Sequence, residues 1–88
     1  DNINREQMAV MMYRYANYKG YDTSGRADIS GFQDASNVNT FAKEAMEWAV
    51  GVGVITGKDN GTKLDPQGNA SRAETATIIT RFSENVEE

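Results

Sequence analysis

The side chain with the clearest chemical potential is an arginine at the expected start of a helix near the C-terminus. In the stretch NASRAETATIITRF, Ser71 is a good N-cap, and Glu74 three residues later completes a capping box. Arg72 therefore falls at the first helical position, where the positive pole of the helix mildly disfavours a cation. A cation in that position suggests that a negatively charged group binds beside it.

The physical basis for such a site is simple. Unpaired backbone N–H groups and the positive helix pole attract carboxylates and phosphates, and the planar fork of an arginine grips a carboxylate with two hydrogen bonds. We therefore hypothesise that Arg72 contributes to an anion-binding pocket. The alternative is that Arg72 forms a salt bridge with a carboxylate of a neighbouring unit, and the residues alone leave both open.

The same helix plan occurs twice in the chain. NREQMAVMMYRYANYKG near the N-terminus aligns with SRAETATIITRFSENVE, so that Arg5 matches Arg72 and Gln7 matches Glu74. Asn4 and Gln7 form the first capping box, as Ser71 and Glu74 form the second. Two helices built to one plan predict a tandem-repeat protein cut partway through a unit.

A second pair of arginines aligns further along these helices. Arg14 matches Arg81, and both fall late in their segments. Because a cation suits the negative pole of a helix, we predict structural roles for both.

Three segments carry apolar residues at the spacing of one buried helical face. In the first segment these residues are Met8, Met11, Met12, Tyr15 and Tyr18. In TFAKEAMEWAVGVGV they are Phe41, Ala45, Trp48, Ala49 and Val52. In the last segment they are Ile78, Ile79, Phe82 and Val86. The pattern predicts a mostly α fold of short helices joined by long glycine-rich loops.

The middle helix has recognisable boundaries. Asn39 or Thr40 can cap its start, and Gly51 or Gly53 can end it in a left-handed conformation. No two runs show the strict alternation that a half-buried sheet requires.

Composition excludes several kinds of function. The chain has 88 residues, a net charge of −4, and neither cysteine nor histidine. It therefore lacks disulfides, thiolate metal sites and the commonest general base, and we expect no metal or other cofactor. The acidic balance argues against nucleic acid or an anionic membrane as partner, and no apolar run could cross a bilayer. Because no signal peptide or methionine begins the chain, we expect a fragment of a longer protein, with any export signal upstream.

Several motifs together resemble the S-layer homology domain, the repeat that fastens proteins to Gram-positive cell walls. They are FQD with Phe32 and Asp34, EWAVGVGVITG with Trp48 and Gly57, and LDPQGNASRAE with the helix start at Arg72. The resemblance divides the chain into a closing helix of a preceding repeat at residues 1–20, a linker at 21–31 and a complete repeat at 32–88.

The resemblance implies a non-catalytic, extracellular anchoring module. In this family three repeats usually assemble around a pseudo-threefold axis, and grooves between them bind secondary cell-wall polysaccharide. In several members the recognised group is a terminal N-acetylmannosamine with a pyruvate ketal, which is an anion. The implied partners are this polysaccharide and neighbouring repeats of the same chain or of other copies.

The resemblance suggests the following carbohydrate-binding residues: Arg72, Arg5, Trp48, Asp34 and Gly57. Trp48 could stack on a sugar ring, but core packing explains it equally well. Asp34 could accept hydrogen bonds from sugar hydroxyls or simply cap a turn, and Glu74 is expected to act in its capping box rather than on a ligand. Glu6 stands where the family signature has alanine, so a negative charge beside Arg5 could repel an anionic ligand.

Other features of the sequence bear on three alternative functions. Asp59, Asn60 and Asp65 do not follow the spacing of an EF-hand loop, so a turn explains them better than calcium. A hydrolase using two of the loop carboxylates Asp28, Asp34, Asp59 and Asp65 lacks any pairing signal. The remaining alternative is a structural or self-association module without sugar affinity, which could form a homo-oligomer through apolar helix faces.

Overall fold

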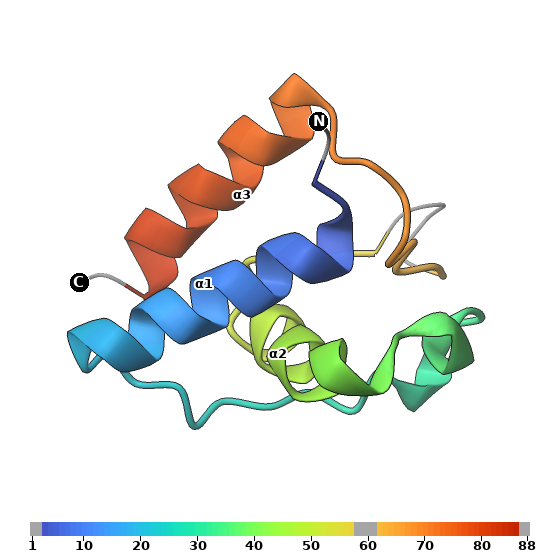
Figure 1. Cartoon of the computed structure of the whole chain (residues 1–88), viewed down its shortest axis with the longest axis horizontal. Coiled ribbons are helices and arrows are strands. Elements are labelled where there is room, and N and C mark those ends of the chain that lie inside the picture. The colour runs from blue at the N-terminus through green and yellow to red at the C-terminus, as the bar shows by residue number, and fades with distance from the viewer. Residues whose placement is uncertain (1–2, 58–61, 87–88) are drawn as a thin grey trace.

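The computed structural model describes residues 3–57 and 62–86 and contains three α-helices (Figure 1). They are α1 (Arg5–Lys19), α2 (Thr40–Gly51) and α3 (Arg72–Asn85), with two short 3-10 helices, η1 (Ile29–Gly31) and η2 (Ala35–Asn37), before α2. Within these residues no strand forms, and an isolated β-bridge pairs Asn4 with Asn69. The prediction of a mostly helical fold is confirmed. Among the described helices, none is long and apolar enough to span a membrane.

Both predicted capping boxes are present, and both helices begin at the predicted arginines. At α1, the Asn4 side chain accepts a hydrogen bond from the Gln7 N–H at 2.8 Å, and the Gln7 side chain accepts one from the Asn4 N–H at 2.9 Å. At α3, Ser71 and Glu74 exchange the same pair of bonds at 3.1 and 2.8 Å. Local sequence thus sets both capping boxes. At α1 distant backbone contacts add to this, because the Arg5 and Glu6 N–H groups donate to the Gly68 and Pro66 carbonyl oxygens at 3.0 and 2.9 Å.

The start of α2 is capped by a residue from α1. Asn39 is the N-cap of α2, but its side chain caps no helical N–H group. Instead, the buried Glu6 carboxylate accepts hydrogen bonds from the Asn39 backbone N–H at 3.0 Å and from its side-chain amide at 2.6 Å. Glu6 therefore ties α1 to the positive end of α2. At the other end, α2 closes at Gly51, and Gly53 takes the predicted left-handed conformation.

The core lies where α1 crosses α2, with α3 closing the remaining side (Figure 1). The face of α2 toward this core is rich in alanine, and Ala9 and Ala16 of α1 are fully buried. Such small side chains let helices approach closely. The largest fully buried apolar side chains are those of Trp48, Met46, Ile55 and Leu64.

The predicted apolar stripes are partly wrong. Met8, Ile78, Phe82 and the small residues of α2 are buried as expected, but five large members of the stripes are exposed. These are Met11, Tyr15, Tyr18, Phe41 and Ile79, with exposed fractions between 45% and 86%. On α1 and α2 buried alanines form much of the contact face, so the larger residues next to them are left outside it. On α3 the buried residues are Ile78 and Phe82, and Ile79 lies outside that face.

The first part of the predicted linker, residues 21–28, is held against α2. The Ala27 N–H donates to the Glu47 carbonyl oxygen at 3.0 Å. The Arg26 guanidinium bonds to the Tyr13 hydroxyl at 2.7 Å and to the Glu44 carboxylate at 3.0 Å, so it joins α1 to α2. The linker passes so close to Gly51 that a Cβ there would lie 2.8 Å from the Arg26 carbonyl carbon.

Gly51→Ala tests this close approach. Alanine normally favours a helix over glycine, but here its methyl group would push on backbone atoms of Arg26 and Ala27. We expect the variant to lose about 1–3 kcal/mol of unfolding free energy, measured by urea denaturation. Gly31→Ala is the control, because a Cβ at Gly31 meets nothing within 4 Å. Equal stability of the two variants would contradict the packing described.

Candidate functional site

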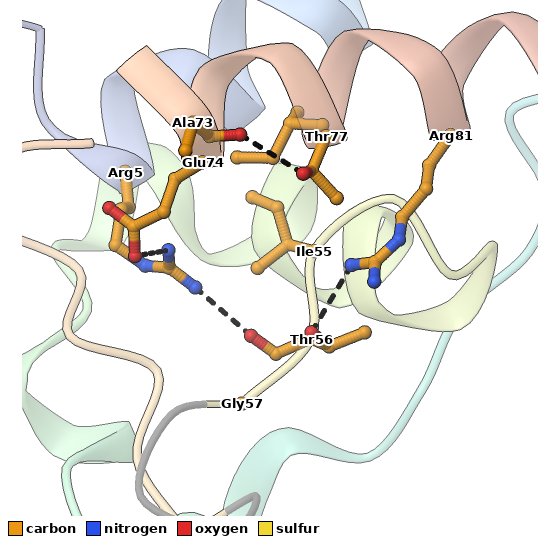
Figure 2. Close-up of a pocket in the computed structure, with 9 residues that line it drawn as sticks. Arg5, Ile55, Thr56, Gly57, Ala73, Glu74, Thr77 and Arg81 are labelled. Carbon is orange, nitrogen blue, oxygen red and sulfur yellow. Dashed lines mark hydrogen bonds and ion pairs between the residues drawn. The ribbon is translucent and has the colours of Figure 1, made fainter. Parts of the chain in front are cut away.

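A pocket of about 280 Å³ lies between α3 and the loop that follows α2 (Figure 2). Its lining comes from three parts of the chain: the first turn of α1, the loop at residues 55–57, and one face of α3. The lining residues are Arg5, Ile55, Thr56, Gly57, Ala73, Glu74, Thr77, Ile78 and Arg81. Segments from both copies of the repeated helix therefore meet at this pocket, with the predicted site residues Arg5 and Gly57 among them.

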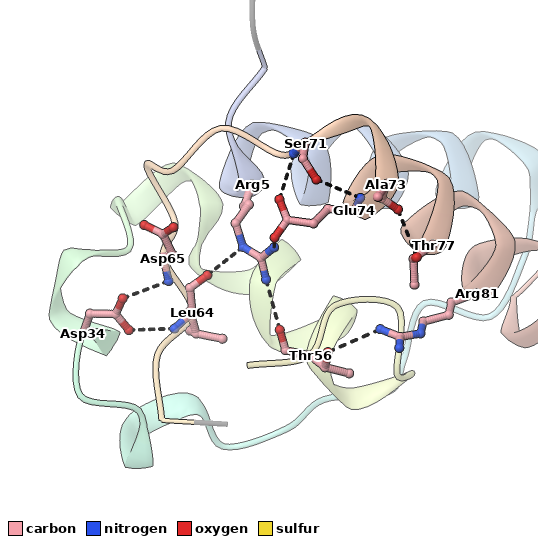
Figure 3. Close-up of polar contacts among 10 residues, drawn as sticks. All are labelled: Arg5, Asp34, Thr56, Leu64, Asp65, Ser71, Ala73, Glu74, Thr77 and Arg81. Carbon is pink, nitrogen blue, oxygen red and sulfur yellow. Dashed lines mark hydrogen bonds and ion pairs between the residues drawn. The ribbon is translucent and has the colours of Figure 1, made fainter. Parts of the chain in front are cut away.

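Arg5 forms a buried wall of the pocket and is held entirely by protein acceptors. Its Nε donates to the Leu64 carbonyl oxygen at 2.8 Å, and one terminal nitrogen donates to the Thr56 carbonyl oxygen at 3.0 Å (Figure 3). The other terminal nitrogen lies 3.5 Å from a Glu74 carboxylate oxygen. Only 4% of Arg5 is exposed. All three guanidinium nitrogens are thus engaged inside the protein.

Glu74 has two roles at once. One carboxylate oxygen completes the capping box with Ser71, and the other pairs with Arg5. The predicted capping role is confirmed, and the ion pair with Arg5 adds a link between the two repeated helices that the sequence did not indicate.

Arg81 approaches the same pocket from farther along α3. Its side chain points back toward the loop and donates to the Thr56 hydroxyl at 3.3 Å (Figure 2). The prediction that Arg81 compensates the negative helix pole is wrong, because the last turn of α3 contains no basic residue. The spacing of Arg81 from Glu74 indicates that it faces the pocket, since positions 74, 77, 78 and 81 share one helical face.

Arg72 begins α3 as predicted, but it is exposed and does not belong to the lining of the pocket. The structure therefore does not bring Arg72 and Arg5 together at one site. Glu6 does not face the pocket either, because its carboxylate is occupied at the start of α2.

Asp34 organises the loop that supports Arg5. Its two carboxylate oxygens accept hydrogen bonds from the backbone N–H groups of Leu64 and Asp65, each at 2.8 Å (Figure 3). Burial raises the pKa of Asp34, but these hydrogen bonds outweigh it, so the pKa lies below its ordinary value. The carboxylate thereby fixes the segment whose Leu64 carbonyl receives Arg5. Asp34 therefore has a structural role, but not as the cap of its own turn, because its side chain makes no capping bond at η2 and binds a distant segment instead.

Trp48 lies in the core with no exposed surface. Its ring packs near Tyr13 and Phe82, with centroid distances of 5.4 and 6.3 Å. Of its two possible roles, the structure shows core packing, and the ring offers no face to a sugar.

The alternative sites receive no added support from the structure. Asp59 and Asn60 lie outside the described residues. In the part of the chain that is described, no three acidic side chains cluster in a way that could hold a metal ion. Asp28 caps η1 by accepting a hydrogen bond from the Ser30 N–H at 2.9 Å.

We expect Arg5 and Arg72, although equivalent in sequence, to contribute differently to the stability of the fold. Arg5→Ala removes a buried cation, its hydrogen bonds to the Leu64 and Thr56 carbonyl oxygens and its ion pair with Glu74, so we expect a loss of about 2–4 kcal/mol in unfolding free energy. Arg72→Ala is the matched control and should change it by less than about 0.5 kcal/mol, because the side chain is exposed. Denaturant unfolding of both variants measures this. A comparable loss in Arg72→Ala would contradict the network.

Asp34→Asn tests the role of the lowered pKa. A carboxyl whose pKa is lower in the folded state stabilises the fold above its unfolded pKa of about 3.9, and this contribution is lost as the pH falls through the folded pKa. Asparagine retains one acceptor oxygen, so the variant should be less stable at pH 7 and lose less stability on acidification. Thermal melts between pH 7 and pH 2 measure the difference. The pKa values of Asp22 and Asp28 are also lowered, but these residues contribute equally to the pH dependence of both proteins. Parallel curves for the two proteins would refute this role.

Comparison with known proteins places these features in a family. The sequence profile of the S-layer homology domain matches residues 31–76. The chain is 41% identical over 69 residues to a surface-layer 125 kDa protein of Lysinibacillus sphaericus, which covers 76% of this chain and 6% of that protein. No solved structure matches significantly.

Two enzymes contain a similar segment. An endoglucanase of Bacillus sp. (strain KSM-635) is 32% identical over 79 residues, and an amylopullulanase of Thermoanaerobacterium thermosulfurigenes is 32% identical over 80 residues. Each alignment covers 90% of this chain but only 8% and 4% of the respective enzyme. The chain thus corresponds to a small part of each of these three relatives. Because the family profile covers more than half of its residues, the chain belongs to the S-layer homology domain family.

Proposed function

We propose that this chain is a non-catalytic module that anchors a larger surface protein to a Gram-positive cell wall, and that its pocket binds an anionic group of the secondary cell-wall polysaccharide. Domains of this family typically anchor surface proteins to the cell wall. The relatives named above include a surface-layer protein and two enzymes with different names. A segment shared by such different proteins fits an accessory anchoring role better than a catalytic one.

The observation that carries the proposal is the charge and size of the pocket. Two arginines and one glutamate line it, which leaves one positive charge in excess in a chain that is acidic overall. Its volume of about 280 Å³ is at the low end for ligand pockets, which suits one terminal sugar rather than a long stretch of polymer. A pyruvylated terminal N-acetylmannosamine is the specific ligand that we propose, because its carboxylate matches this charge.

Arg72 has a proposed role in a second, equivalent pocket. Arg5 reaches the Thr56 and Leu64 carbonyls of the repeat that follows its helix. If another repeat follows α3, Arg72 would reach the corresponding carbonyls of that repeat, so each junction between repeats would form one pocket. Neighbouring repeats, arranged around a pseudo-threefold axis, are the partners that this arrangement requires.

A second candidate function is self-association without sugar affinity. Met11, Tyr15 and Tyr18 lie one to two turns apart on α1, and all three are exposed. Exposed apolar side chains gathered on one helix face are typical of contact surfaces. A homo-oligomer formed through this face is the structural alternative to wall binding.

Sedimentation with purified Gram-positive cell walls distinguishes the two functions. Because every residue that lines the pocket belongs to this chain, the chain alone should bind intact walls and fail to bind walls from which the non-peptidoglycan polymer has been removed. Equal binding to both preparations would exclude the polysaccharide as the ligand. Absence of binding, together with a dimer or trimer in analytical ultracentrifugation, would favour self-association.

A further inference from the structure

The pocket contains two arginines whose electrostatic situations differ. Arg5 is 3.5 Å from the Glu74 carboxylate, so its charge is matched within the protein. Arg81 donates to the Thr56 hydroxyl, which is neutral, and among the described residues no carboxylate lies within salt-bridge distance of it. The excess positive charge of the pocket therefore resides on Arg81.

The surroundings of Arg81 leave its guanidinium accessible. Arg81 and Thr77 line the pocket and also a second hollow of about 310 Å³ on the next stretch of α3. Arg81 thus borders open space on two sides, and the exposed Glu84 also lines the second hollow. Its 3.3 Å bond to a neutral hydroxyl is longer than a typical hydrogen bond. Replacing this bond by a charge-assisted pair between Arg81 and a ligand carboxylate would be favourable.

Thr56 contacts both arginines. Its carbonyl oxygen accepts from Arg5 at 3.0 Å, and its hydroxyl accepts from Arg81 (Figure 3). The buried Arg5 thereby fixes the loop, and the loop in turn orients Arg81 at the mouth of the pocket. The two arginines therefore differ in role, because Arg5 is buried and structural whereas Arg81 is half-buried and borders the pocket.

We propose that Arg81, rather than Arg5 or Arg72, is the residue that grips the anionic group of the ligand and so determines specificity for acidic over neutral polysaccharide. The inference rests on the proposed function of the pocket. The Arg81 fork forms two parallel hydrogen bonds with one carboxylate, a geometry that a lysine at the same position cannot reproduce.

The test compares two forms of one polymer. Secondary cell-wall polysaccharide with pyruvylated N-acetylmannosamine is used before and after mild acid removal of the pyruvate, and both forms are titrated calorimetrically into the chain. The variants are Arg81→Ala, Arg81→Lys and, as the matched control, Arg14→Ala. Arg14 is the sequence equivalent of Arg81 on α1 and is exposed away from the pocket.

For the unmodified chain we expect the pyruvylated polymer to bind about ten- to a hundredfold more tightly than the neutral one, the range of one charge-assisted hydrogen-bonded pair. Arg81→Ala should reduce this ratio toward one, Arg81→Lys should give an intermediate ratio, and Arg14→Ala should leave it unchanged. Added salt should lower the ratio for the unmodified chain, because the pair is accessible to solvent.

An unchanged ratio in Arg81→Ala, or equal affinity of the unmodified chain for both polymers, would overturn the assignment of Arg81 while leaving wall-polymer binding itself intact. Failure of the unmodified chain to bind either polymer would instead refute the proposed function, and this assignment with it. Circular dichroism checks the fold of each variant. If Arg81→Ala fails to fold, Arg81→Lys decides, because a ratio equal to that of the unmodified chain would equally overturn the assignment.

Discussion

Arg5 enters the structure from the first turn of α1 and reaches acceptors on three separate segments. These are the loop after α2, the segment around Leu64 that Asp34 stabilises, and the first turn of α3. A buried guanidinium is costly unless its donors are satisfied, and here each nitrogen has a partner. One side chain thus joins the two copies of the repeated helix and forms a wall of the pocket between them.

The arrangement explains how an acidic chain can offer a site to an acidic ligand. Glu74 neutralises Arg5, and Glu6 is directed to the start of α2, so neither carboxylate opposes a ligand charge at Arg81. Most of the remaining acidic side chains lie outside the pocket lining and are screened over about 8 Å at physiological salt. Local placement of charge therefore decides the preference of the pocket, and the net charge of the chain does not.

Features that depend on neighbouring residues in sequence could be predicted from it. Both capping boxes, the first residues of α1 and α3, and the left-handed Gly53 follow from local backbone chemistry. The burial of Met11, Tyr15 and Phe41 was predicted wrongly, because periodicity marks an apolar face without showing that alanines form the closest contact. The capping of α2 by Glu6 joins residues far apart in the chain, and no local pattern indicates it.

The site itself was only partly visible in the sequence. Arg5 and Gly57 line the pocket, and their proposed contact with carbohydrate stays a prediction. The position of Arg81 along the helix suggests a role at the negative pole, whereas the helical face that it shares with Glu74 and Thr77 directs it to the pocket. The roles of Arg72 and the pyruvylated ligand remain predictions, as does the division of the chain at residues 20 and 31.

The location of the bound polymer is the most direct test of whether the pocket beside Arg81 is the binding site. Backbone amide shifts of the isotopically labelled chain, followed by nuclear magnetic resonance during addition of pyruvylated polysaccharide fragments, report where the ligand lies. If the pocket binds the anionic group, the largest changes will occur at Thr56, Gly57, Ala73 and Thr77 around it. Changes confined to the exposed face of α1 at Met11, Tyr15 and Tyr18, or to the surroundings of Arg72 alone, would contradict binding at the pocket.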